Sequence, residues 1–186
     1  MGDGLKWATC NVGANAPEAY GDYFAWGETA TKSDYSWSTY FDNPSGDGET
    51  FTKYATDKKT ALDLTDDAAT QNWGSTWRIP TDAEWTTLRN TANFDWEWDD
   101  TRKGYTVTSK IVGYVGNTIF LPAAGYRLGT YHLYDAGYGY YYGYYWSSTL
   151  YESLSYGARS VYFSSEIVKR YGEHRYYGYP VRPVSE

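Results

Sequence analysis

The sequence predicts a single loop-rich α+β domain with few short helices and small antiparallel sheets. Three observations lead to this fold class. Leu, Ile, Val and Phe together make up only 27 of 186 residues, yet 9 Trp and 23 Tyr supply enough apolar surface for a core. Helix signals are few and short. The remaining apolar residues alternate in short segments bounded by Gly, Asn and Pro, which is typical of strands and turns.

Two helices are expected in the first half of the chain. Residues 60–70 have a weak helical pattern. Residues 81–84 (Thr-Asp-Ala-Glu) form a capping box. In this motif the Thr81 hydroxyl accepts a hydrogen bond from the Glu84 amide, and the Glu84 carboxylate accepts one from the Thr81 amide. This helix should continue to about Thr91 and turn Trp85 and Leu88 inward.

Strands are expected over residues 106–110 and 118–121, with Gly116-Asn117 as a tight turn before the second. Residues 158–163 alternate in the manner of a half-buried strand. Residues 177–184 are expected to be extended, and their two prolines place them at an edge or after a bulge.

The composition excludes several classes of function. No apolar run reaches the roughly 18 residues of a membrane span, and no phosphate-binding GxxxxGK[ST] motif is present. A net charge of −7 and a pI near 4.8 argue against binding to nucleic acid. A single cysteine, Cys10, permits neither an internal disulfide nor a thiolate metal cluster. We expect no metal and no cofactor. The first residues do not resemble a signal peptide.

Catalytic interpretations find little support. Only His132 and His174 offer imidazole bases, and neither lies in a recognisable motif. Carboxylate pairs that a glycosidase would need occur at Asp66-Asp67, at Asp99-Asp100 and within residues 42–49, but such pairs are more often turn and cap residues. The acidic stretch 42–49 lacks EF-hand spacing and is interpreted as a solvated loop.

The tyrosine-rich second half is the most informative feature. Residues 129–186 hold 15 of the 23 tyrosines and one Trp, whereas residues 1–128 hold eight of the nine tryptophans. Tyrosine interleaved with Ser and Gly is the chemistry of an antibody paratope. Tyr144, Tyr145 and Trp146 are consecutive and cannot all be exposed, so some rings must replace the missing aliphatics in the core. The others predict a binding surface, because exposed aromatic patches mark binding sites.

An ordered series of motifs carries a resemblance that covers essentially the whole chain. It comprises Asp3–Ala8, Gly21–Glu28, Trp77–Trp85, Phe120–Arg127, Tyr145–Ser148 and Gly178–Val184. The first four resemble the Fibrobacter succinogenes major paralogous domain of gut Bacteroidetes and their phages. The last two resemble the variable region of target proteins of diversity-generating retroelements. The resemblance implies a C-type lectin fold of the formylglycine-generating-enzyme branch. The catalytic cysteine pair of that branch is absent from this sequence, so its activity is not expected.

In such systems a reverse transcriptase mutates template adenines, so that AAC codons become NNC codons. Trp146, Glu152, Glu166, Lys169 and Glu173 cannot arise in this way. The resemblance implies that residues 1–128 form a scaffold and that residues 129–186 are variable and bind ligand. The candidate ligand-binding residues are Tyr138, Tyr140, Tyr142, Tyr151, Leu154, Tyr156, Ser160, Tyr162, Tyr171, Gly172, His174 and Tyr177.

We therefore expect a non-catalytic binding protein on a virion or a cell surface, whose partner is an unknown protein or glycan. Membrane insertion by this domain is not expected. At the rim of the face, specificity would be tuned by charged and polar residues, namely Arg159, Arg170, Glu173, His174 and Arg175. The alternatives are a carbohydrate-binding or glycan-active domain of fixed specificity and a structural stalk domain. The binding-protein hypothesis would be favoured if the tyrosine side chains point outward while Trp146, Val161, Phe163 and Val181 point inward.

Overall fold

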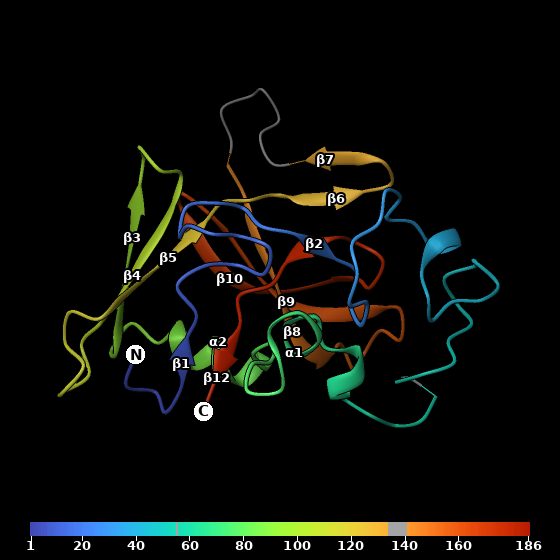
Figure 1. Ribbon diagram of the computed structural model, residues 1–186, viewed down its shortest axis with the longest axis horizontal. Coiled ribbons are helices and arrows are strands. Elements are labelled where there is room, and N and C mark those ends of the chain that lie inside the picture. Colours follow the sequence, from blue (N-terminus) through green and yellow to red (C-terminus); the bar gives the residue numbers. More distant parts are fainter. Residues whose placement is uncertain (55, 134–140) are drawn as a thin grey trace.

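The computed structural model describes residues 1–54, 56–133 and 141–186. It is a loop-rich α+β structure with two short helices and five small antiparallel sheets among the described residues (Figure 1). The helices are α1 (Ala68–Trp73) and α2 (Asp82–Leu88), and 3₁₀ turns lie at Trp37–Thr39 and Leu64–Asp66. The strands are β1 (Lys6–Trp7), β2 (Tyr23–Phe24), β3 (Phe94–Asp99), β4 (Gly104–Ser109), β5 (Thr118–Pro122), β6 (Tyr126–Leu128), β7 (Tyr131–Leu133), β8 (Gly143–Leu150), β9 (Gly157–Ser164), β10 (Ile167–His174), β11 (Tyr179–Pro180) and β12 (Val184–Ser185).

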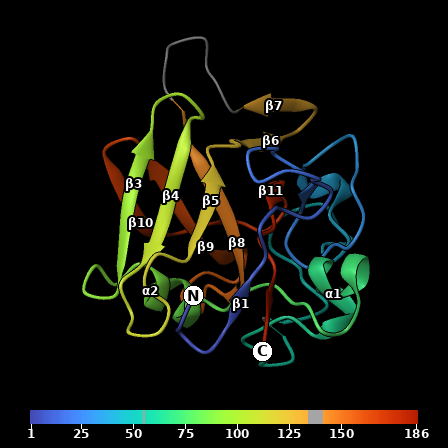
Figure 2. The same cartoon turned by 60° about the vertical axis from the view of Figure 1, so that its left-hand side comes forward.

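Two three-stranded sheets, β10-β9-β8 and β3-β4-β5, enclose the largest core cluster. Figure 2 shows β3, β4 and β5 in front of the other sheet. Aliphatic side chains of β4 and β5, such as Val107 and Leu121, pack in this cluster with Tyr145, Val161 and Phe163 of β8 and β9. The predicted α+β class is confirmed, and the aromatic rings do supply much of the core.

The capping-box helix is confirmed. The Thr81 hydroxyl accepts from the Glu84 amide, the Glu84 carboxylate accepts from the Thr81 amide, and α2 runs to Leu88. Trp85 and Leu88 are 1% and 0% exposed. The prediction of a helix over residues 60–70 is confirmed only in part: a 3₁₀ turn covers Leu64–Asp66 and α1 covers Ala68–Trp73, whereas residues 60–63 are not helical. The Asp67 carboxylate caps the amide of Thr70, so α1 begins only at Ala68.

The predicted strands 106–110 and 118–121 are confirmed as β4 and β5. The strand around residues 158–163 is also present, as β9, but it is not half-buried. Both faces of β9 are packed, because Val161 and Phe163 belong to one core cluster and Ala158 to another, and Ala158, Ser160, Val161 and Phe163 are all at most 1% exposed. Its alternation therefore separates two packed clusters, not core from solvent.

The C-terminal segment is extended, as predicted, and it closes the domain onto its N-terminal part. β11 pairs with β2, and β12 pairs with β1, placing Lys6 opposite Ser185. The two chain ends therefore lie side by side (Figure 1). Between these strands the buried guanidinium of Arg182 donates to Asn11 Oδ1 and to the carbonyls of Ala8 and Phe120. In the part of the chain that the structure describes, no helix is long and apolar enough to cross a membrane.

Candidate binding face

The alternation of β8 and β9 separates core side chains from those of a tyrosine-rich face. On the side towards β4 and β5, Tyr145, Val161 and Phe163 are fully buried. Gly143 belongs to the same side, where a Cβ would lie only 2.0 Å from the Phe163 ring, so glycine lets this ring pack against the sheet. The opposite side carries Tyr144 and its cross-strand partner Tyr162.

The rings on that opposite side form a continuous network that we call the tyrosine face. Tyr144 lies at its centre, with ring centroids 5.0 Å from those of Tyr126 and Tyr162 and 6.5 Å from that of Tyr171. Tyr142 stacks on Tyr162 at 5.8 Å, and Tyr177 stacks on Tyr126 at 5.7 Å. The tyrosine face thus consists of Tyr126, Tyr142, Tyr144, Tyr162, Tyr171 and Tyr177.

A set of fully buried rings lies beneath the tyrosine face. Trp146 stacks on Tyr179 at 4.2 Å and donates its indole N–H to the carbonyl of Phe24. Tyr179 in turn lies 5.0 Å from Tyr144, so the face rests directly on this pair. The expected inward placement of Trp146, Val161, Phe163 and Val181 is confirmed, since each is at most 1% exposed.

Burial favours the protonated hydroxyls of four face tyrosines, namely Tyr126, Tyr144, Tyr162 and Tyr177. Burial raises the pKa of Tyr144, and neighbouring tyrosines raise it further. Burial likewise raises the pKa of Tyr126, Tyr162 and Tyr177. The Lys169 ammonium lies 5.0 Å from the ring centroid of Tyr162 and 5.4 Å from that of Tyr171. The face therefore offers neutral hydroxyls and aromatic surface near one lysine.

A cavity of about 230 Å³ lies at the far end of β10. Its lining includes six candidate residues that the sequence singled out, namely Tyr151, Leu154, Tyr156, Tyr171, Gly172 and His174. The His174 ring contacts Tyr156 at 4.9 Å and Tyr177 at 5.8 Å. Its Nδ1 atom is buried without a hydrogen-bond partner among the described residues. This cavity joins the tyrosine face through Tyr171.

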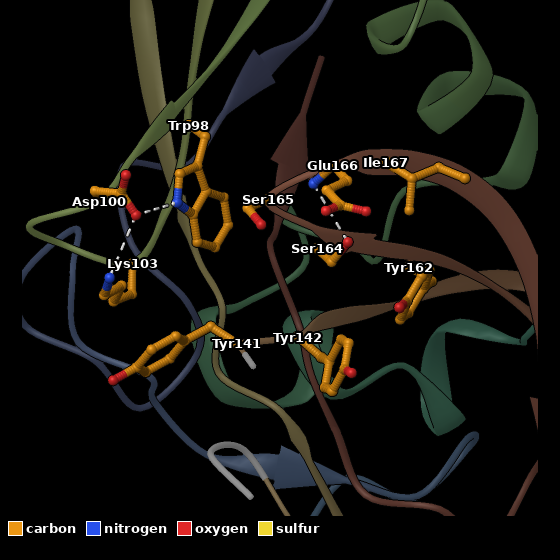
Figure 3. Close-up of a pocket in the computed structure, with 10 residues that line it drawn as sticks. All are labelled: Trp98, Asp100, Lys103, Tyr141, Tyr142, Tyr162, Ser164, Ser165, Glu166 and Ile167. Atoms are coloured by element: carbon orange, nitrogen blue, oxygen red, sulfur yellow. Dashed lines mark hydrogen bonds and ion pairs between the residues drawn. The ribbon is translucent and has the colours of Figure 1, made fainter. Parts of the chain in front are cut away.

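A second hollow, a cleft of about 320 Å³, lies at the opposite end of β9 and β10 (Figure 3). Two candidate residues, Tyr142 and Tyr162, form part of its wall. The rest comes from the end of β3 and the β3–β4 turn, from Tyr141 just before β8, and from residues 164–167 at the turn between β9 and β10. The two hollows flank the tyrosine face.

The remaining candidate residues do not all reach this surface. Tyr138 and Tyr140 lie outside the described residues. Ser160 is 1% exposed, and its hydroxyl has no partner in the described structure, so it lies beneath the face. Gly172 lies on the other side of β10 from Tyr171, where a Cβ would meet the Tyr151 ring at 2.4 Å.

The rim residues expected from the sequence include one error. Arg175 is not at a rim: it is 0% exposed and donates through Nη1 to Asp42 Oδ2 at 2.9 Å. Its guanidinium carbon lies 4.5 Å from the Phe51 ring centroid and 5.2 Å from that of Trp26. Arg159 packs over Tyr151, and Arg170 pairs with Asp82.

The same ion pair corrects the interpretation of residues 42–49 as a solvated loop. Asp42 and Asn43 are 0% and 2% exposed, and Asp42 Oδ1 accepts from the amides of Thr52 and Lys53. Asp47 does face solvent, where hydrogen bonds from Asn43 and two backbone amides lower its pKa. Within residues 1–54, 56–133 and 141–186, no group of three His, Cys, Asp or Glu side chains could hold a metal ion.

The other carboxylate pairs have structural partners. Asp66 accepts from Lys53 and from the Tyr54 hydroxyl, and Asp67 caps α1. Asp99 accepts from the amides of the β3–β4 turn and from Arg102, which lowers its pKa. Asp100 accepts from Trp98 Nε1 and Lys103, which also lower its pKa.

Sequence reasoning missed several residues of this surface. Tyr126 and Tyr144 were not singled out, although Tyr144 follows Tyr142 by two residues and so shares its side of the strand. Trp98 and Lys103 were also missed. The sequence pattern that could have predicted them is in residues 94–99, where Trp96 and Trp98 are two residues apart, as in a strand, and an acidic turn follows.

Comparison with known proteins adds one match. Residues 95–184 are similar to a family described as a domain of unknown function (DUF8237). No curated protein and no solved structure matches the chain. The matched segment begins in β3 and ends at β12, so it contains the tyrosine face and the residues that line both hollows.

Proposed function

We propose that this chain is a non-catalytic binding protein whose C-terminal face is diversified by a retroelement to bind varying targets on cell surfaces. In this proposal the fold is a C-type lectin fold, and the protein acts in phage receptor binding or in bacterial surface display. The observation that carries the proposal is the tyrosine face above a fully buried support. Side chains of the face can be exchanged without removing a core residue, which is what a diversified surface requires.

The placement of Ser160 and Gly172 refines which positions can vary. Ser160 lies on the same side of β9 as Tyr162 but is 1% exposed, so a larger side chain there would disturb the packing beneath the tyrosine face. A side chain at Gly172 would displace Tyr151. We therefore propose that diversification concentrates at Tyr142, Tyr162 and Tyr171 and around the cavity at the end of β10.

The hydrolytic alternative has weaker support. A general acid needs a carboxyl group with a raised pKa in a cleft. In the cleft of Figure 3, Asp100 instead has a lowered pKa. Asp67 has a pKa raised by burial, but its oxygens accept from the amides of Thr70 and Ile79 in the interior.

The genetic test is to sequence the DNA around the gene. The proposal expects a nearby reverse-transcriptase gene and a repeat of the codons for residues 131–184 that differs only at adenines. A locus without such a repeat would refute diversification.

The binding test uses labelled protein on a panel of intact gut bacterial strains. Tyr171→Ala should reduce staining of any bound strain by at least about tenfold, since a central aromatic contact is worth about 2 kcal/mol or more at a hot spot. Tyr114→Ala is the matched control, because Tyr114 is similarly exposed but lies in the loop after β4. Equal loss in both variants would refute the assignment of the face.

A further inference from the structure

The cleft of Figure 3 is built from two parts of the chain that are distant in sequence. The β3–β4 hairpin supplies one wall, and the start of β8 with the β9–β10 turn supplies the other. Its volume is about 320 Å³. The cleft is lined by Trp98, Asp100, Lys103, Tyr141, Tyr142, Tyr162, Ser164, Ser165, Glu166 and Ile167.

The aromatic walls of the cleft are held in place by their own contacts. The Trp98 ring packs edge-on against Tyr105 at 5.3 Å, and its indole N–H donates to Asp100 at 3.0 Å. Tyr142 and Tyr162 stack at 5.8 Å with an angle of 27° between their planes. Such fixed rings offer apolar surface at little cost in conformational entropy.

Hydrogen-bonding groups lie between these rings. Asp100 and Glu166 provide carboxylate acceptors, while Lys103, Ser164 and Ser165 provide donors. Lys103 Nζ is 3.3 Å from Asp100 Oδ1. The Glu166 backbone amide donates to Ser164 Oγ at 3.4 Å, which fixes the turn above the cleft. The wall therefore combines donors and acceptors over a short distance.

The charges around the cleft balance, and this argues for a neutral occupant. Asp100 and Glu166 are opposed by Lys103 in the cleft and by Lys169 beside it. Both lysines already lie over aromatic rings: Lys103 Nζ is 5.0 Å from the centroid of Tyr141, and Lys169 Nζ is 5.0 Å from that of Tyr162. A cationic ligand would have to compete with these ammonium groups.

We propose that this cleft binds one pyranose residue at the end of a neutral glycan. A pyranose has an apolar C–H face that packs on an aromatic ring and a rim of hydroxyls that both donate and accept hydrogen bonds. Trp98 packs on the sugar, Asp100 and Glu166 accept from its hydroxyls, and the serines donate to them. This assignment rests on the proposed binding function and names the ligand class of one part of its surface. Three of the groups, Trp98, Asp100 and Lys103, come from the scaffold half.

The test is saturation-transfer NMR with a panel of methyl pyranosides at millimolar concentration. One sugar residue should bind with a dissociation constant on the order of 1 mM, because so small a ligand makes few contacts. Trp98→Ala should weaken binding at least about tenfold, the scale of losing one aromatic contact. Trp77→Ala is the matched control, because Trp77 is also partly exposed but lies near α1.

A second variant guards against misfolding of Trp98→Ala. Ser165 is exposed at the cleft, so Ser165→Trp should fill the site and abolish binding while every original ring stays in place. Glu166→Gln keeps hydrogen-bonding capacity and removes one charge. For a neutral sugar its effect should stay within about threefold, and added salt should change binding little.

Two outcomes would overturn the assignment. The first is binding of choline or of N-acetyl-lysine methyl ester without any pyranoside, with loss in Glu166→Gln and in high salt, which would identify a cation site. The second is the absence of any pyranoside signal from protein that still stains intact bacteria in a Tyr171-dependent way. That result refutes the sugar site and leaves the proposed function standing. Pyranoside binding without a retroelement repeat would support the cleft and refute diversification.

Discussion

The tyrosines of this molecule form two groups that use the same side chain differently. In the interior, Tyr35 and Tyr40 donate their hydroxyls to the carbonyls of Tyr23 and Trp26, each at 2.6 Å, and Tyr145 donates to Pro122 at 2.9 Å. On the tyrosine face, the hydroxyls of Tyr144 and Tyr171 donate to no backbone carbonyl within the described residues, and these rings contact mainly one another. Interior tyrosines thus serve as directed crosslinks between separate segments of the chain, whereas face tyrosines present rings and hydroxyls that a partner can use.

The difference teaches how a domain poor in aliphatic residues can be both stable and adaptable. A buried hydroxyl without its acceptor is costly, so Tyr35, Tyr40 and Tyr145 each require one particular carbonyl. A ring in the face network requires only neighbouring rings. The first group should therefore tolerate substitution poorly and the second well.

The largest effect is expected at the support of the face. Trp146→Ala removes a fully buried ring and its hydrogen bond to Phe24, and we expect the free energy of unfolding to fall by about 3–5 kcal/mol. Chemical denaturation measures this loss. Trp146→Phe, which keeps a ring against Tyr179, should lose clearly less. Equal losses in the two variants would show that packing on Tyr179 contributes little.

The next prediction compares an interior tyrosine with a face tyrosine, each replaced by phenylalanine so that only the hydroxyl oxygen is removed. Tyr35→Phe leaves the carbonyl of Tyr23 without this donor in the interior, so the free energy of unfolding should fall by about 1–3 kcal/mol. Tyr144→Phe should cost less than about 0.5 kcal/mol, the range of substitutions away from such bonds. Thermal unfolding of the two variants under identical conditions measures both losses of stability. A larger loss at Tyr144 would contradict the division into two groups.

Alkaline pH should act through every tyrosine whose pKa is raised by burial, and Tyr40 and Tyr145 represent the interior group. Burial raises the pKa of Tyr40 and Tyr145 above the ordinary value of 10.0, so the folded protein keeps these protons when the unfolded chain releases them. Their contribution to stability is complete below pH 10 and is lost as the pH rises above it. Each such tyrosine lowers the free energy of unfolding by about 1.4 kcal/mol per pH unit.

This pH dependence is measured by urea denaturation between pH 8 and pH 12, taken as an approximate window around the tyrosine pKa. Above pH 10, Tyr40→Phe should make the free energy of unfolding fall less steeply with pH, by the contribution of one titrating proton. An unchanged slope would show that Tyr40 ionises as readily in the folded protein as in the unfolded chain.

Among the substitutions by alanine, the smallest effect on stability is expected at the face itself. Tyr171 is 36% exposed, so Tyr171→Ala should lower the free energy of unfolding by less than about 1 kcal/mol. Tyr114→Ala should cost a similar amount. A loss at Tyr171 comparable to that of Trp146→Ala would mean that the face rings also support the fold.

Local signals in the sequence were sufficient for some elements. The capping box at Thr81 needs only four neighbouring residues, and α2 forms where they predict it. The helix expected over residues 60–70 lacks its first residues because long-range contacts intervene: the Leu62 amide donates to the carbonyl of Ser148, and the Leu150 amide donates to that of Thr60. These residues therefore run beside β8 and cannot begin a helix.

The candidate surface could be predicted only in part for the same reason. Alternation along β8 and β9 predicts which side chains share one side of a strand, and it correctly separates Tyr144 from Tyr145. It does not reveal that both sides of β9 are covered, so Ser160 was placed on the surface. Nor does it show that Arg175 meets Asp42, a partner 133 residues away. The cleft of Figure 3 likewise depends on a hairpin whose position relative to β9 no local pattern contains.

The pairing of the first and last strands has a mechanical consequence. Because β1 and β12 are antiparallel and Lys6 lies opposite Ser185, both ends of the chain leave the pair on the same side. A tension applied to the two ends would peel the strands apart one residue pair at a time instead of loading all their hydrogen bonds together. The domain should therefore yield first at this seam when stretched, while β8, β9 and β10 still bear no load.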